Sequence, residues 1–130
     1  MSLFTPGLSN DIFIAAITRV EIVAAITRRA RSGSINTTDA VSACAQFLND
    51  CQSEYQVVQV TEDIINSAIR LAEAHGLRGY DAVQLAAGRE INALCLANSL
   101  PPVTFVSADN ELNAAAVSEG LMIENPNYYP

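Results

Sequence analysis

The feature that most constrains this 130-residue chain is a repeated change of pattern, in which a short apolar run gives way to a helical stretch at a carboxylate. The change occurs over residues 12–21, 77–85 and 103–109, and the carboxylates are Glu21, Asp81 and Asp109. Strands that alternate with helices favour a mostly parallel sheet covered on both faces, so the pattern predicts an α/β fold. Ligands of such sheets bind at the carboxyl ends of the strands. The three acids are therefore candidates for one shared site.

Hydrophobic periodicity and turn residues divide the chain into alternating elements. Residues 1–11, which include Pro6 and Gly7, are expected to be a loop or vector-derived sequence, and residues 12–130 a single domain. The inner face of the second helix is expected to hold Val41, Cys44, Ala45 and Leu48. We expect strands over 12–16, 55–60, 103–106 and 121–123, and helices over about 18–31, 37–51, 61–75, 80–98 and 109–119.

Composition narrows the class of protein. Half of the residues are hydrophobic and 16% are charged, which is typical of a globular domain. The sequence has no apolar run long enough to span a bilayer and no basic segment followed by an apolar one at its start, so we expect no membrane partner and a cytoplasmic location.

The charge pattern leaves two interpretations open. A net charge of −7 is not typical of nucleic-acid-binding proteins, yet the chain has no lysine and gathers four of its seven arginines into one short segment. Such a cluster can contact phosphate or a partner, or can simply complement the dipole at a helix end. Its members are Arg19, Arg28, Arg29 and Arg31.

The cysteine and histidine residues do not form a pattern typical of a metal site, a disulfide framework or a catalytic centre. Cys44, Cys51 and Cys95 lack both the CxxC spacing of a zinc site and the even count of a disulfide framework, which favours buried, reduced thiols. His75, the only histidine, stands before Gly76 at the expected end of a helix, where it suits the helix dipole better than a catalytic role.

Each acid has a purely structural alternative. Glu21 completes a Thr-x-x-Glu capping box with Thr18, Asp81 falls in the first turn of a helix, and Asp109 is a candidate N-cap. Taken together, however, carboxylates crowded in one cleft are costly unless a cation neutralises them. Carboxylate and water oxygens are the ligands that Mg²⁺ or Mn²⁺ prefers, and such a centre can activate water for phosphoryl displacement.

Three segments of the sequence resemble the successive acidic motifs of PIN domains, and most closely those of VapC-type toxins from type II toxin–antitoxin pairs. The second motif is the most specific, because an Arg-Gly-Tyr-Asp-Ala-Val turn into a helix is not a generic pattern. The resemblance covers essentially everything from Ile12 onward. The three segments are Thr18–Ala25, Gly76–Ala86 and Val106–Leu112.

The resemblance implies a three-layer PIN-like fold and a Mg²⁺- or Mn²⁺-dependent endoribonuclease, a hydrolase held inactive by a small antitoxin and usually homodimeric. It implies that Glu21, Asp81 and Asp109 form the catalytic metal centre. It further implies supporting roles for Thr18 and Ser107, and contacts from Arg19 and Arg78 to phosphate or a partner.

One departure from the family is serious. PIN domains open with a central strand that ends in an aspartate, followed by a helix, and this sequence has neither. Asp11 precedes the first expected strand and so stands at its wrong end. We therefore expect a truncated form, arising from the expressed segment or from a misplaced start codon, with weak or absent activity.

Two further classes stay open. The absent first acid, the negative charge and the apolar helices favour a non-catalytic PIN-like protein that dimerises or binds an antitoxin-like peptide. A phospho-acceptor regulatory domain would also hold Mg²⁺ near strand ends, but such domains normally need a lysine, which this chain lacks.

Overall fold

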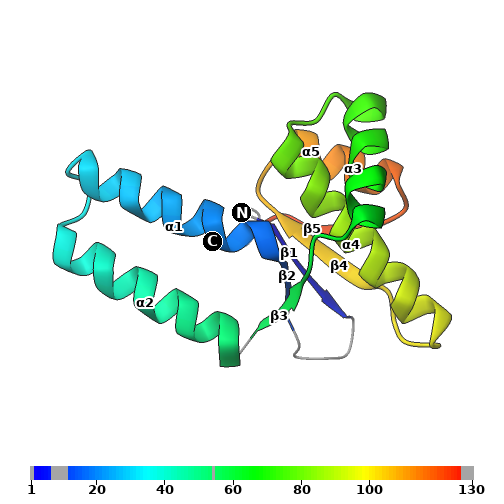
Figure 1. The fold of residues 1–130 in the computed structure, drawn as a ribbon. Helices are drawn as coiled ribbons and strands as arrows, with labels where there is room; N and C mark the ends of the chain where they lie inside the picture. The colour runs from blue at the N-terminus through cyan, green and yellow to red at the C-terminus, as the bar shows by residue number, and fades with distance from the viewer. Residues whose placement is uncertain (1, 7–11, 54, 127–130) are drawn as a thin grey trace.

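The computed structural model describes residues 2–6, 12–53 and 55–126, and they form a mixed α/β fold (Figure 1). Five helices and five strands follow one another along the described chain. Their bounds are β1 Ser2–Pro6, β2 Ile12–Ala15, α1 Ala16–Arg31, α2 Thr37–Ser53, β3 Tyr55–Val58, α3 Glu62–His75, α4 Gly79–Ala97, β4 Val103–Ser107, α5 Asn110–Ser118 and β5 Met122–Glu124.

The strands form one sheet in the order β3-β2-β1-β4-β5. β2 pairs with β3 and β4 pairs with β5 in parallel, whereas β1 pairs antiparallel with both β2 and β4. The expectation of a mostly parallel sheet is therefore met by the common direction of β2, β3, β4 and β5, and is wrong for the two central pairings.

The N-terminal segment differs most from expectation. Residues 2–6 were expected to be a loop, but they form β1 at the centre of the sheet, where Phe4 stands opposite Phe13 on one side and Phe105 on the other. A short segment can take this place because both neighbouring strands offer unpaired backbone groups. Met1 and residues 7–11, including Asp11, lie outside the described residues, so the loop prediction is untested there.

Among the residues whose burial the structure describes, most of the hydrophobic core lies in the second half of the chain. α3 packs on α4, α4 contacts β1, β2 and β4, and α5 contacts β4 and β5. Leu71, Leu85 and Phe105 are completely buried, and among the residues whose burial is described Ala15 is the one member of the core cluster that precedes Ile64 in the sequence. This half supplies the rigid frame on which the acidic residues sit.

Helices α1 and α2 form a hairpin that projects from the sheet (Figure 1). The expected inner face of α2 is wrong for Val41, which is 65% exposed, and for exposed Ala45, whereas Cys44 is partly buried and Leu48, although 45% exposed, lines a groove shared with α1. Ala40 and Cys51 are buried instead. A two-helix hairpin has only one partner to pack against, so α2 cannot bury a full apolar stripe.

Several boundaries follow directly from the sequence. Thr61 caps α3, its hydroxyl accepting a hydrogen bond from the Ile64 amide at 3.2 Å, and Gly76 ends the helix in the left-handed region at φ +65°. An L-residue with a Cβ is strained at that φ, which explains a glycine there. In the described part of the chain, no helix combines the length and apolar character needed to cross a membrane.

Candidate metal centre

The connection between α3 and α4 positions Asp81. Gly76 reverses the chain, buried Leu77 anchors it to the core, and the extended backbone of Arg78 starts α4. Asp81 then falls in the first helical turn, as its sequence pattern predicts, and its negative charge complements the positive end of the helix dipole.

The junction of β4 and α5 positions Asp109. Its Oδ1 accepts a hydrogen bond from the Leu112 amide at 3.0 Å, so the predicted N-cap is confirmed. Buried Ser107 accepts a hydrogen bond from the Asp109 amide at 3.1 Å through its hydroxyl. Ser107 therefore holds the backbone of the acid, and the N-cap bond in turn orients the carboxylate.

Asp81 and Asp109 meet at a single polar cavity of about 240 Å³. Burial raises the pKa of Asp81, the nearby negative charge of Asp109 raises it further, and Arg78 opposes the rise. Glu111 adds to the negative potential. The cavity is lined by Gly76, Leu77, Arg78, Asp81, Asp109, Glu111 and Leu112.

Glu21 does not line this cavity. It lies in α1, within electrostatic range of the Tyr80 hydroxyl, which Asp81 also influences. Burial is the main cause that raises the pKa of Tyr80, Thr18 opposes it, and the charges of Glu21 and Asp81 reinforce it. Glu21 and Asp81 therefore flank Tyr80, while Asp81 and Asp109 share the cavity.

The predicted capping box at Thr18 and Glu21 is wrong. α1 begins at Ala16, two residues before Thr18, and its N-cap Ala15 makes no side-chain cap bond. Thr18 is instead fully buried inside the helix. Its hydroxyl is near enough to that of Tyr80 to lower the Tyr80 pKa, but within the described structure neither hydroxyl makes a hydrogen bond of regular geometry. The two buried hydroxyls therefore form a polar spot, and the charges of Glu21 and Asp81 both act on its Tyr80 member.

Among residues 2–6, 12–53 and 55–126, no group of three histidine, cysteine, aspartate or glutamate side chains is arranged to hold a metal ion. The described geometry thus offers a carboxylate pair, Asp81 and Asp109, with Glu111 beside them. Sequence reasoning did not single out Glu111, although its place two residues after an N-cap aspartate was the available signal.

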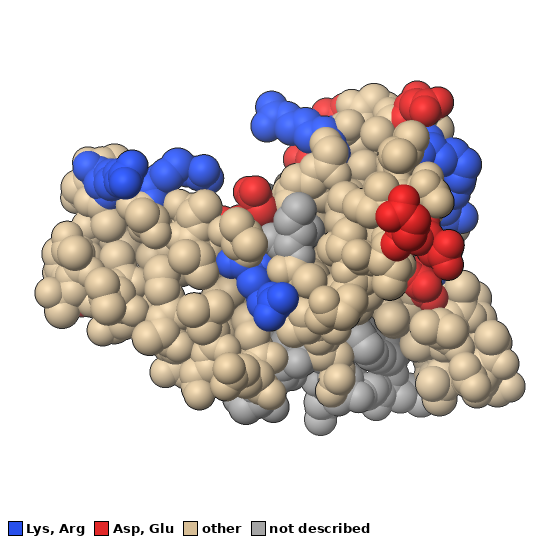
Figure 2. Space-filling model, viewed as in Figure 1, with Lys and Arg blue, Asp and Glu red and all other residues tan. Residues whose placement is uncertain are grey.

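The two candidate phosphate contacts have different surroundings. Arg78 lines the acidic cavity, whereas the Nε of Arg19 donates to the Ala16 carbonyl at 3.2 Å and its side chain borders a separate apolar groove. Arg28, Arg29 and Arg31 are exposed in the last turn of α1, where basic charge complements the helix dipole. Figure 2 shows basic side chains gathered over that end of the hairpin.

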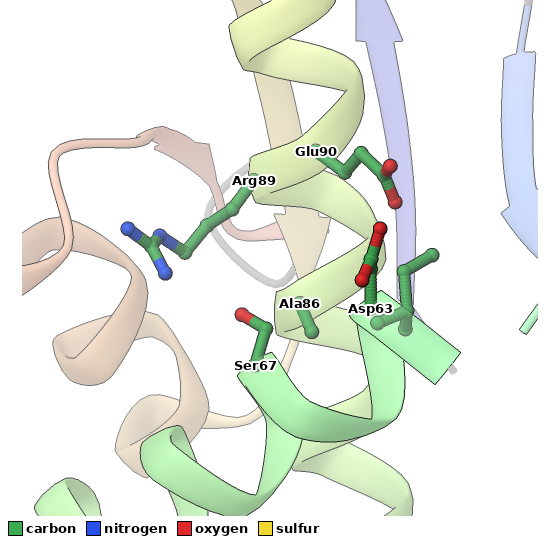
Figure 3. A pocket seen from close by; sticks show the side chains of 6 residues that line it. Asp63, Ser67, Ala86, Arg89 and Glu90 are labelled. Carbon is green, nitrogen blue, oxygen red and sulfur yellow. The ribbon is translucent and has the colours of Figure 1, made fainter. Parts of the chain in front are cut away.

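A second charged cavity, of about 260 Å³, lies between α3 and α4. Figure 3 shows the Asp63 and Glu90 carboxylates on one side of it and Arg89 pointing away from both. Arg89 is turned toward Glu119, with 3.5 Å between Arg89 Nε and Glu119 Oε1. Asp63 and Glu90 are both exposed, so their carboxylates are less fixed in position than that of Asp81, which is partly buried.

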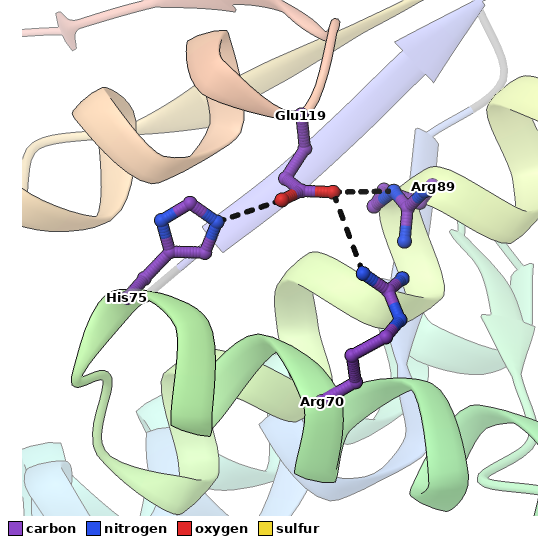
Figure 4. A network of polar contacts seen from close by, with 4 residues as sticks. All are labelled: Arg70, His75, Arg89 and Glu119. Atoms are coloured by element: carbon purple, nitrogen blue, oxygen red, sulfur yellow. Dashed lines mark hydrogen bonds and ion pairs between the residues drawn. The ribbon is translucent and has the colours of Figure 1, made fainter.

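His75 takes part in a structural ion-pair network (Figure 4). Its Nε2 lies 2.7 Å from Glu119 Oε2, and Arg70 Nη1 lies 4.0 Å from Glu119 Oε1. The contact with His75 is the main cause that lowers the pKa of Glu119, and Arg89 and Arg70 add to it. The network joins α3 and α4 to the end of α5, which is away from the acidic cavity.

The cysteines are free thiols. Cys51 and Cys95 are buried, as predicted, and Cys44 is partly buried. Burial is the main cause that raises the pKa of Cys51, so this thiol is a poor nucleophile.

Compared with protein-family models and with curated proteins, the chain matches none. The sequence motifs and the geometry of the acidic cavity are therefore the observations that bear on function.

Proposed function

We propose that the chain is a PIN-like, metal-dependent endoribonuclease and the toxin of a toxin–antitoxin pair. The observation that carries the proposal is the polar cavity in which Asp81 and Asp109, two residues of the acidic motifs, come together from distant parts of the chain. In this account the α/β fold is the three-layer PIN fold, and the protein acts as a cytoplasmic homodimer restrained by its antitoxin.

The donor atoms of the cavity fit Mg²⁺ or Mn²⁺. Asp81 and Asp109 supply hard carboxylate oxygens, and Glu111 adds a third acid at the rim. The raised pKa of Asp81 reflects burial and repulsion from Asp109, and a bound cation would relieve both. When bound, the metal supplies an activated water and neutralises charge on the phosphate.

The chain's own residues would set the geometry. The N-cap bond to Leu112 fixes Asp109, so its carboxylate is pre-oriented before any ligand enters. Arg78 borders the same cavity, and a guanidinium can hold a phosphate through two parallel hydrogen bonds. In this proposal Asp81 and Asp109 bind the metal ion, and Arg78 orients the phosphate.

Glu21 has a separate place in this proposal. Since it lies beside Tyr80 and not in the cavity, it would reach the metal only through water or a rearrangement of α1. A centre with two direct carboxylates binds a divalent ion less firmly than one with three. We therefore propose that this chain cleaves RNA weakly or not at all unless the third acid moves in.

Cleavage of single-stranded RNA with Mn²⁺ tests the proposal. We expect slow cleavage that is abolished in both Asp81→Asn and Asp109→Asn, because either change removes a metal ligand. Asp63→Asn is the matched control, since Asp63 lines the other charged cavity. Cleavage that persists in both variants would overturn the assignment of the site.

A non-catalytic interaction protein is the second candidate. An apolar groove of about 430 Å³ between α1 and α2 favours it, and Val20 beside that groove is 66% exposed. Exposed apolar surface of this kind is typical of a contact between proteins. The groove is lined by Ala16, Arg19, Val20, Val23, Ala24 and Leu48.

Sedimentation of the chain separates the two candidates. A dimer that dissociates in Val20→Asp, in a chain that shows neither Mn²⁺ binding in titration nor Mn²⁺-dependent cleavage, would favour the interaction protein. Glu73→Lys, a charge change on the exposed face of α3, is the control and should leave the dimer intact.

A further inference from the structure

A third cavity, of about 410 Å³, separates one face of α5 from β5 and the residues that follow it. Asn110, Asn113, Ala114 and Val117 follow helical spacing, so they share that face. Ile123 and Asn125 line the other wall. The cavity therefore combines an apolar floor with three amide side chains, one residue away from Asp109.

The amide of Asn113 has a fixed orientation. Its Nδ2 donates to the Ser107 carbonyl at 2.7 Å, and because a carbonyl oxygen can only accept, the amide cannot be flipped. Its Oδ1 is consequently fixed as an acceptor. Asn113 is only 5% exposed, and this Oδ1 is buried without a hydrogen-bond partner in the described part of the chain.

Asn110 supplies the complementary group. Its Oδ1 accepts from Asn125 Nδ2 at 3.4 Å, which directs the Asn110 amide nitrogen away from that contact as a donor. Asn110 is exposed at the mouth of the cavity, whereas Asn113 is deep within it. The helix face that lines the cavity thus carries a donor at the mouth and, beneath the surface, an unpaired acceptor, next to apolar side chains.

We infer that this cavity binds a nucleobase whose Watson–Crick edge carries an exocyclic amino group beside a ring nitrogen that can accept a hydrogen bond, as adenine and cytosine do. The amino group would donate to Asn113 Oδ1, and the ring nitrogen would accept from Asn110. A single asparagine can make both of these hydrogen bonds to adenine in nucleic-acid recognition, and here two asparagines would share them. Ala114, Val117 and Ile123 would contact the face of the base.

Because Asn113 Oδ1 is buried without a hydrogen-bond partner, we infer a ligand that can donate a hydrogen bond to it. A buried acceptor without a partner is unfavourable, so a ligand that donates to it gains more than one that binds at an already satisfied group. The wall over Oδ1 must part to admit the amino group, and the new hydrogen bond offsets that opening. Assigning the base to RNA rests on the proposed nuclease function, because the cavity begins one residue after Asp109.

Titration of the isotope-labelled chain with adenosine, cytidine and uridine tests the inference by nuclear magnetic resonance. We expect saturable shifts of the Asn110 and Asn113 side-chain amides and of the Val117 and Ile123 methyl groups with adenosine and cytidine. Uridine should bind about tenfold more weakly, since it lacks the amino donor. Nucleosides have no phosphate and the solution contains no metal ion, so the result is independent of the cleavage assay.

Two variants make the test sharp. In Asn113→Leu, adenosine should bind no better than uridine. Because this change also removes the bond to Ser107, Asn110→Ala serves as the second variant and should lose the same preference without unfolding. Asn66→Ala, an exposed asparagine of α3, is the matched control and should keep it. Equal binding of the three nucleosides, or a preference unchanged in Asn110→Ala, overturns the inference.

Competition distinguishes an RNA base from a free nucleotide. A uridine-rich RNA with one central adenosine should displace bound adenosine more effectively than the all-uridine RNA does. If neither RNA displaces adenosine, the assignment to RNA is overturned, even where cleavage at the acidic cavity has been demonstrated.

Discussion

The two parts of this molecule differ in how completely their apolar side chains are buried. In the part formed by α3, α4, α5 and β4, side chains such as Leu71 and Phe105 are completely enclosed, while in the α1–α2 hairpin Val20 and Val41 are each about two-thirds exposed, at 66% and 65%. The first part therefore encloses a hydrophobic core, whereas these apolar side chains of the hairpin are exposed. Figure 2 shows basic side chains at the tip of the hairpin, and acidic and basic side chains side by side over the α3–α4 part.

The difference indicates where function is fixed and where it can vary. Asp81 and Asp109 stand on elements of the packed part, so their geometry is set by the core and by the N-cap bond of Asp109. The hairpin, with few enclosed side chains, belongs to the least stable part of the structure and can adjust to a partner. Glu21 lies on the hairpin side of the boundary between them.

The largest expected effect separates the two parts by stability. Leu71→Ala should lower the free energy of unfolding by about 2–5 kcal/mol, because it leaves a cavity in the core. Val41→Ala in the hairpin should change it by less than about 0.5 kcal/mol. Denaturant unfolding measures both, and effects of similar size would contradict the comparison.

A metal ion should stabilise the packed part. Mn²⁺ at a hundred times its dissociation constant should raise the free energy of unfolding by about 2.7 kcal/mol, since it binds the folded chain alone. Asp81→Asn should remove this gain, whereas Leu48→Ser on the hairpin should retain it. Calorimetric unfolding with and without Mn²⁺ gives the difference, and a gain that survives in Asp81→Asn would exclude this cavity.

Asp109 has a structural and a chemical role that two substitutions separate. Asp109→Ala should destabilise the chain by about 1 kcal/mol, because it removes the N-cap of α5. Asp109→Asn keeps a capping side chain and should leave stability nearly unchanged while weakening metal binding. Thr61→Ala, at the N-cap of α3, is the control for a cap without a metal role. Equal loss of stability in both Asp109 variants would show that the charge, not the cap, matters.

The Glu119 network gives a small effect that depends on pH. Its carboxyl has a lowered pKa, so its contribution is complete above the ordinary value for the unfolded chain and is lost as the pH falls through the lower folded value. Asp81, whose pKa is raised, acts in the opposite sense and favours the folded state as it becomes protonated. Glu119→Gln should lower stability at neutral pH by about 1 kcal/mol.

Denaturant unfolding of Glu119→Gln at neutral and acidic pH checks this sign. The difference from the unchanged chain should disappear toward acidic pH. His75→Gln should reproduce part of the loss at neutral pH, because His75 is the closest contact of the carboxylate. A difference that grows on acidification would contradict the direction of the pKa shift.

Local signals in the sequence predicted much of the packed part. Thr61, Gly76 and Asp109 each act through a cap that involves residues only a few positions away, and all three caps are present. α4 was likewise predicted to within a residue at each end, since Gly79 and the prolines after it bound a continuous helical pattern. Interactions of this range can be deduced without knowing the tertiary structure.

The features that the sequence did not predict depend on contacts between elements of the fold. β1 takes its place from backbone pairing with β2 and with β4, which is far along the chain, and Pro6 followed by Gly7 indicated a loop instead of a strand. Thr18 resembled an N-cap, but the chain enters the helix two residues earlier and buries it. Val41 and Leu48 had helical spacing, yet nothing in that spacing says whether a second layer exists to cover them.

In the acidic site, too, some features could be predicted from the sequence and others could not. The sequence motifs indicated Asp81 and Asp109, and the fold brings them to one cavity. The position of Glu21 depends on how α1 leaves β2, and the role of Glu111 depends on the direction of its side chain toward Asp81. Neither property is contained in the residue type or its spacing.

The most direct measurement is the paramagnetic broadening of backbone amide resonances by Mn²⁺ in the full chain. The account predicts that trace Mn²⁺ broadens the signals of residues 76–81 and 109–112 first, and that Asp81→Asn abolishes this pattern. Broadening centred on Asp63 and Glu90, or spread evenly over the acidic surface, would contradict the proposal that Asp81 and Asp109 form a metal centre.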